Sequence, residues 1–234
     1  MFVPIHDENS LKHVPFQYVT VLLIAANVAV FLLQQSGMSF CQLASFAIVP
    51  VELLGVGVFN NGSCTTAGAV QIPENLTVVS YMFFHGDWMH LIGNMLFLWV
   101  FGDNVEDAVG HLKFLLFFIL CGVFAGLLHT FVMSESARPL VGASGGVAGV
   151  IAAYLMLHPR VRVWVLALRF IPLRISAAIA LGLWIGLQFV MALMPDGTPV
   201  AWWAHIGGII AGAVLILVMR RPGVPLFDRN ESRA

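Results

Sequence analysis

Six long apolar stretches, separated by shorter polar segments, limit most strongly how this 234-residue chain can fold. A bilayer crossing takes about 20 consecutive apolar residues in a helix. Soluble domains carry about 25% charged residues, whereas this chain has 10% charged and 59% hydrophobic residues. The sequence therefore predicts an all-α polytopic membrane protein, with spans at about 17–35, 87–103, 112–133, 143–158, 173–194 and 202–220.

The basic residues predict how these spans are oriented. Cytoplasmic loops of membrane proteins carry an excess of Lys and Arg. If the amino terminus is cytoplasmic and the spans alternate, every Lys and Arg except Arg138 falls on the cytoplasmic side. We therefore expect one six-helix membrane domain at 17–220 with a long outer loop at 36–86, between short cytoplasmic termini at 1–16 and 221–234.

Charge and the first residues of the chain restrict its partners and its location. A net charge of −1 provides no field that would attract nucleic acid, so we expect membrane lipid and membrane proteins as partners. The amino-terminal segment lacks the pattern of a cleaved signal and is not Arg-rich like an organelle transit peptide. The expected location is a prokaryotic cytoplasmic membrane, with both termini cytoplasmic.

The three cysteines leave one question open. Cys41 and Cys64 both fall in the predicted outer loop, where an oxidising compartment would allow a disulfide, and Cys121 falls in a span. Spacing alone does not decide whether the two loop cysteines pair. No cysteine pair has the spacing of zinc ligands, and we expect neither a metal nor a cofactor.

A serine and a histidine stand among glycines inside two of the apolar stretches. Ser144 lies in the run Val-Gly-Ala-Ser-Gly-Gly, and His205 lies in Ala-His-Ile-Gly-Gly. Polar groups at membrane depth cost free energy, so they mark candidate functional sites. The predicted orientation places both residues near the outer face. Alternatives from the residues alone are a helix cap at Ser144 and a histidine that hydrogen-bonds between helices at His205.

A second polar group, at the same predicted depth, precedes these two residues. His90 and Asn94 are four residues apart and share one helix face. Both can donate hydrogen bonds to a developing oxyanion. Alternatives are a metal pair, for which asparagine is a poor ligand, and a polar clasp between helices. His85 either assists this site or structures the preceding loop.

Taken together, these motifs resemble the rhomboid family of intramembrane serine proteases, from about residue 80 to 212. The resemblance implies a six-helix bundle around a short central fourth helix that carries the serine. It implies Ser144 as nucleophile and His205 as general base, with His90, Asn94 and the Ser144 backbone N–H as oxyanion donors. Membrane-protein substrates would be cut in or near a transmembrane segment. The motifs are His90-x-x-x-Asn94, Phe101-Gly102 with Glu106 and Gly110, Gly142 to Gly145, and Ala204-His205-x-x-Gly208.

Two departures from the family pattern bear on the site. Many members have an aromatic residue four positions after the serine, where this chain has Ala148. Support for His205 is therefore expected from Trp202 or Trp203, and Gly142 is expected to let the backbone approach substrate closely. The outer loop also lacks any Lys or Arg. The alternative function is a non-catalytic rhomboid-like binder or chaperone of membrane helices, but both Ser144 and His205 are present.

Overall fold

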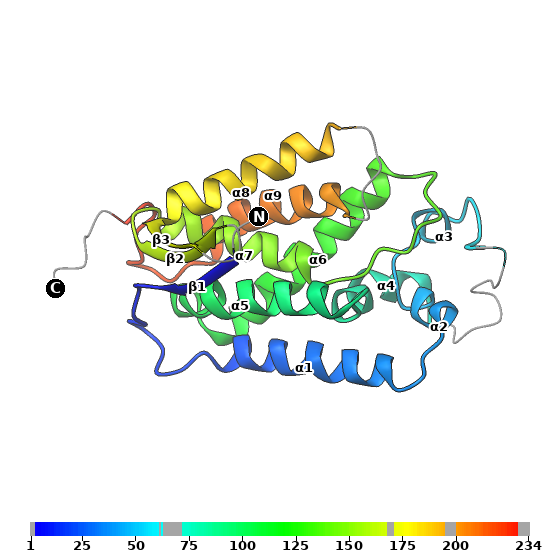
Figure 1. The fold of residues 1–234 in the computed structure, drawn as a ribbon, viewed down its shortest axis with the longest axis horizontal. Coiled ribbons are helices and arrows are strands. Elements are labelled where there is room, and N and C mark those ends of the chain that lie inside the picture. The colour runs from blue at the N-terminus through cyan, green and yellow to red at the C-terminus, as the bar shows by residue number, and fades with distance from the viewer. Residues whose placement is uncertain (1–2, 61, 63–71, 168–170, 195–199, 229–234) are drawn as a thin grey trace.

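The fold is mostly helical (Figure 1). The long helices are α1 (Tyr18–Gln35), α5 (Trp88–Val109), α6 (His111–Val132), α7 (Ser144–Leu157), α8 (Ala177–Ala192) and α9 (Trp202–Met219). By length and composition, α1, α6 and α9 can cross a membrane, and α7 and α8 are shorter apolar helices. The chain is therefore an integral membrane protein with several apolar helices. This computed structural model describes residues 3–60, 62, 72–167, 171–194 and 200–228.

Each predicted span coincides with one of these helices, with two boundaries displaced. The fifth span was predicted to begin at residue 173, but α8 begins at Ala177 because the preceding residues pair in a strand. The second span was predicted to end at residue 103, but α5 continues to Val109. The start of α1 supplies hydrogen-bond donors to the acidic last turns of α5: Glu106 accepts from the backbone N–H groups of Val19 and Thr20.

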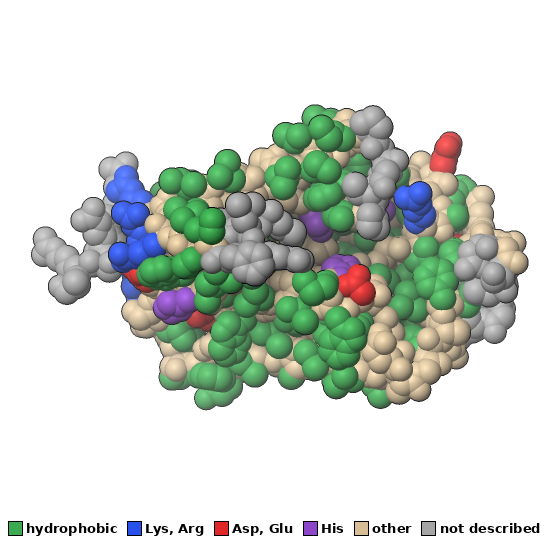
Figure 2. Space-filling model, in the orientation of Figure 1, with side chains coloured by type: hydrophobic (Ala, Val, Ile, Leu, Met, Phe, Trp, Pro, Cys, Tyr) green, Lys and Arg blue, Asp and Glu red, His purple; other side chains and the backbone are tan. Residues whose placement is uncertain are grey.

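The prediction of an all-α chain is wrong in one respect, because three strands form a small antiparallel sheet. The strands are β1 (Val3–Asp7), β2 (Arg162–Ala167) and β3 (Ile171–Ser176), in the order β1-β2-β3. In β2, Val163 and Val165 are buried while Arg162 and Trp164 are exposed, the period-two pattern of a half-buried strand. Figure 2 shows Lys and Arg side chains gathered mainly at this end of the molecule.

Short helices of the predicted outer loop lie at the opposite end of the bundle (Figure 1). Cys41 in this region is disulfide-bonded, whereas Cys121 in α6 is a buried free thiol. Cys64 lies outside the described residues. The short elements are α2 (Phe40–Ala44), α3 (Pro50–Leu53), α4 (Glu74–Ser80) and the 3₁₀ turn η2 (Tyr81–Phe83).

Helix α7 lies at the centre, in contact with α5, α6, α8 and α9. Its 14 residues span ~21 Å, less than the roughly 30 Å of a bilayer's hydrocarbon core. Glycines allow α7 and α9 to touch backbone to backbone. A Cβ atom at Gly208 would lie only 2.0 Å from the Gly145 carbonyl oxygen, and one at Gly212 only 2.2 Å from the Gly149 oxygen. The amino-terminal halves of the two helices are thereby held together.

Candidate active site

Ser144 is the first residue of α7 and is partly buried. Ala143, not Ser144, occupies the cap position before the helix, so the serine hydroxyl is not the helix cap. The first N–H groups of a helix lack partners within it, and they lie at the positive end of its dipole. A nucleophile at this position has backbone donors beside it that can stabilise negative charge on a bound carbonyl oxygen.

His90 and Asn94 of α5 lie against the backbone of Gly142, two residues before the serine. Gly142 has φ +124°, and a Cβ atom there would lie 2.6 Å from His90 Nε2 and 3.8 Å from Asn94 Nδ2. Only glycine fits this conformation and this approach. Asn94 is buried, and its Nδ2 has no hydrogen-bond partner among the described residues. A buried donor without a partner is costly and needs an explanation.

Two hydrogen bonds at the start of α5 involve His90, one at its backbone and one at its ring. The Asp87 side chain caps the helix by accepting from the His90 backbone N–H at 2.8 Å. The backbone N–H of Gly86 donates to His90 Nδ1 at 3.4 Å. A neutral imidazole that accepts at Nδ1 carries its proton on Nε2. The nitrogen that faces Gly142 is therefore a donor.

His85 packs against the ring of His90. Its ring is fully buried and packs edge-on against the His90 ring, with 5.1 Å between centroids. Gln34 of α1 fixes the His85 backbone: the Gln34 side-chain NH₂ donates to the His85 carbonyl at 2.6 Å. Burial lowers the pKa of His85 to about 3, so the ring is neutral. Of the two roles predicted for His85, these contacts favour the structural one.

His205 lies in the first turn of α9, where α8 and α9 supply aromatic and polar contacts. The rings of Trp202 and Trp184 lie with centroids 5.9 Å and 6.0 Å from the His205 ring. His205 Nδ1 lies 2.8 Å from Gln188 Oε1. Sequence reasoning missed both Trp184 and Gln188. They lie four apart on one face of α8, and a glutamine inside an apolar span is itself a functional signal.

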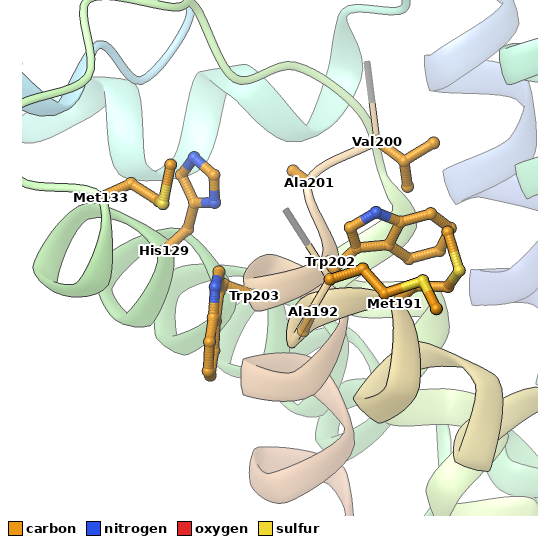
Figure 3. Close-up of a pocket in the computed structure, with 9 residues that line it drawn as sticks. His129, Met133, Met191, Ala192, Val200, Ala201, Trp202 and Trp203 are labelled. Atoms are coloured by element: carbon orange, nitrogen blue, oxygen red, sulfur yellow. The ribbon is translucent and has the colours of Figure 1, made fainter. Parts of the chain in front are cut away.

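Trp203 points to a different place from Trp202. Both tryptophans line a cavity of about 260 Å³ at the start of α9, with Trp203 on the side of His129 (Figure 3). The cavity lies between the ends of α6 and α8, and its other lining residues are mostly apolar. It can hold an apolar group beside the candidate site. The lining residues are His129, Met133, Met191, Ala192, Met194, Val200, Ala201, Trp202 and Trp203.

Ser144 and His205 thus lie on neighbouring first turns. A Cβ atom at Gly145 would lie 3.8 Å from the carbonyl oxygen of Ala204, so the residues next to the serine and the histidine are close together. Figure 2 shows histidine side chains in a recess of the visible face. Among the residues that the structure describes, no three His, Cys, Asp or Glu gather in a way that could hold a metal ion.

Comparison with known proteins places the chain in a family. The family model described as "Rhomboid domain" matches residues 73–222. The chain is 28% identical over 152 residues to "RHOMBOID-like protein 5" of Arabidopsis thaliana, which covers 64% of this chain and 46% of that protein. It is 32% identical over 136 residues to "Rhomboid-related protein 2" of Mus musculus, covering 57% and 44%. The chain thus matches less than half the length of these curated relatives.

Proposed function

We propose that this chain, which belongs to the rhomboid family, is an intramembrane serine endopeptidase with Ser144 as nucleophile and His205 as general base. One observation carries the proposal: the first turn of α7 touches the second turn of α9 backbone to backbone, because Gly208 lies against the Gly145 carbonyl. This contact supports a serine and a histidine that act together at one end of a buried helix.

The proposed reaction is acyl transfer to the serine, followed by hydrolysis. His205 accepts the hydroxyl proton of Ser144, and the serine oxygen attacks the scissile carbonyl carbon. The protonated imidazole then donates that proton to the leaving amine as the peptide C–N bond breaks. Water, deprotonated by His205, then attacks the acyl-enzyme ester; as its C–O bond breaks, the imidazolium returns the proton to the Ser144 oxygen and the second product leaves.

Negative charge on the carbonyl oxygen is stabilised by donors that surround Gly142. The proposed donors are His90 Nε2–H, the Asn94 NH₂ group and the backbone N–H of Ser144. The buried Asn94 Nδ2, which has no partner among the described residues, supports this role, because a donor kept free is available when the oxyanion forms. Removal of one such donor typically costs about 10²–10³ in rate.

Substrates are proposed to be membrane proteins cut in or near a transmembrane segment. A helix shields its carbonyl groups, so the segment must unwind locally, which Gly or Pro near the cleavage site would ease. We further propose six crossings, with both termini on the side rich in Lys and Arg and the site opening toward the other side. The chain then works in contact with lipid and requires no cofactor.

The test is cleavage of a single-span model substrate by the purified chain in liposomes, together with labelling by a fluorophosphonate probe. We expect cleavage and stoichiometric labelling at Ser144, with both lost in Ser144→Ala and in His205→Ala. Cleavage that persists in Ser144→Ala would refute the serine assignment. Stable capture of the substrate span without cleavage or labelling would instead indicate a non-catalytic binder of membrane helices.

A further inference from the structure

The candidate general base has a polar partner on the helix beside it. Gln188 is the buried polar residue of α8, only 2% exposed, on a helix whose other buried residues are Ala and Leu. Its Oε1 lies 2.8 Å from His205 Nδ1. Its side-chain NH₂ donates to the carbonyl of Trp184 at 2.7 Å, one turn earlier. Both ends of the amide are therefore engaged.

These two contacts determine where the histidine proton lies. A backbone carbonyl only accepts hydrogen bonds, so the amide end that faces Trp184 must be the NH₂ group. The end that faces His205 is then the oxygen, which also only accepts. Nδ1 must therefore donate, and a neutral His205 keeps Nε2 unprotonated. A general base needs an unprotonated nitrogen toward the nucleophile.

Among the described residues, no carboxylate acts on this imidazole. The titratable side chains close enough to influence His205 are His90 of α5 and His129 of α6. In serine hydrolases with a triad, an acidic residue accepts from Nδ1–H and holds the imidazole in the required tautomer. Here a neutral amide occupies the corresponding position.

We propose that Gln188 is the positioning residue of this site: it accepts from His205 Nδ1–H, and so keeps Nε2 of the base free to take the proton of Ser144. The kinetic part of this inference rests on the proposed function. The tautomer itself does not, because it is a property of the resting protein. Trp184 contributes twice: its backbone carbonyl accepts from the Gln188 NH₂ group, and its ring stacks on the His205 imidazole.

Two substitutions of similar size separate positioning from packing. Gln188→Met keeps the length of the side chain and removes the strong acceptor, while Gln188→Glu keeps an oxygen acceptor and adds a titratable charge. Leu187→Met is the matched control, because it introduces the same side chain at the neighbouring, lipid-exposed position of α8. All variants are compared as the full chain in liposomes.

The first readout is the tautomer, measured by NMR of ¹⁵N-histidine-labelled protein, with the His205 signal identified by its loss in His205→Gln. We expect protonation at Nδ1 in the wild type and in Leu187→Met, and a mixture of tautomers in Gln188→Met. A wild type protonated at Nε2, or an unchanged Gln188→Met spectrum, overturns the inference. This measurement does not require enzymatic activity, so its result can be distinguished from a failure of the proposed protease function.

The second readout is the kinetics of cleavage between pH 5 and 9. Leaving a buried donor unpaired costs enough free energy to lower kcat about 10- to 100-fold in Gln188→Met, with KM within about twofold. Gln188→Glu should recover most of kcat and move the acidic limb of the pH profile upward by about one unit or more. Wild-type kcat in Gln188→Met overturns the inference. If that variant does not fold, an unchanged acidic limb in Gln188→Glu overturns it.

Discussion

A methyl group added at Gly208 should separate the serine from the histidine. The Cβ atom of alanine would lie 2.0 Å from the Gly145 carbonyl oxygen, whereas ordinary contact begins at 3.4 Å. Because the obstacle is helix backbone rather than a flexible side chain, α9 must move about 1.4 Å away from α7. His205, the proposed base, lies three residues before this glycine, so most of that displacement reaches it.

The expected cost is large for the rate and moderate for stability. A misplacement of about 1 Å can cost about 10²-fold in a positioned reaction, so Gly208→Ala should lose roughly that factor in kcat. Overpacking typically destabilises by about 1–3 kcal/mol. Gly182→Ala on α8 is the matched control, because nothing lies within 4 Å of its new Cβ atom. It should keep full activity.

The assay is initial-rate cleavage of the single-span substrate in liposomes, with Tm measured on the same preparations. Gly212→Ala provides a second comparison, since its Cβ atom would lie 2.2 Å from the Gly149 oxygen, one turn further from the site. It should lower Tm about as much as Gly208→Ala, with a smaller loss of rate. Wild-type turnover in Gly208→Ala would refute the claim that this contact sets the separation of serine and base.

Three other variants test separate parts of the structure. Burial raises the pKa of Asp7 from 3.8 to about 7, so folding favours its protonated form. This group therefore contributes its full share to the unfolding free energy below pH 4. The contribution, up to about 4 kcal/mol, is lost as pH rises through 7. Asp7→Asn should remove the fall of Tm with rising pH that this group causes. The same pH dependence of Tm in Asp7→Asn and wild type would contradict the raised pKa of Asp7. Asn94→Ala should lower kcat about 10- to 100-fold at unchanged KM. If this variant is destabilised but fully active, Asn94 is a structural clasp between helices instead. Tyr81→Phe removes a hydrogen bond of 2.6 Å to the Gly122 carbonyl and should cost about 1 kcal/mol in unfolding free energy. Its kcat should stay near normal, because the Tyr81 carbonyl still accepts from Gly142 N–H; a large loss of kcat at wild-type Tm would show that the hydroxyl serves the site.

The helices could be predicted from sequence because each is a local property of an apolar stretch. Polar residues inside those stretches also stood out: Ser144, His205 and Asn94 are recognisable because apolar neighbours give them no local reason to be there. The sheet was missed because its pairing is not local. Its β1 strand lies at the amino terminus and pairs with β2 more than 150 residues later, and a polar terminal segment gives no sign of such a partner. The alternation in β2 itself was readable.

Gln188 was missed for the same kind of reason. Its polarity was visible in the sequence, but its role depends on which of its two amide ends faces which neighbour. That orientation follows from the Trp184 carbonyl at one end and the His205 imidazole at the other. The first contact is local to α8, whereas the second requires the packing of α8 against α9. Side-chain polarity is therefore predictable here, and the direction of a hydrogen bond is not.

The end of α7 opposite the serine shows why a polar tail can be essential to a buried helix. The last carbonyl groups of a helix lack partners within it, and burial makes such groups costly. Here the backbone N–H groups of Phe227 and Asp228 donate to the carbonyls of Met156 and Leu157. On the last turn, the Tyr154 hydroxyl donates to Asp7 at 2.5 Å. Segments from both ends of the chain thus hydrogen-bond to this end of the short helix. Its other end begins at Ser144, the proposed nucleophile.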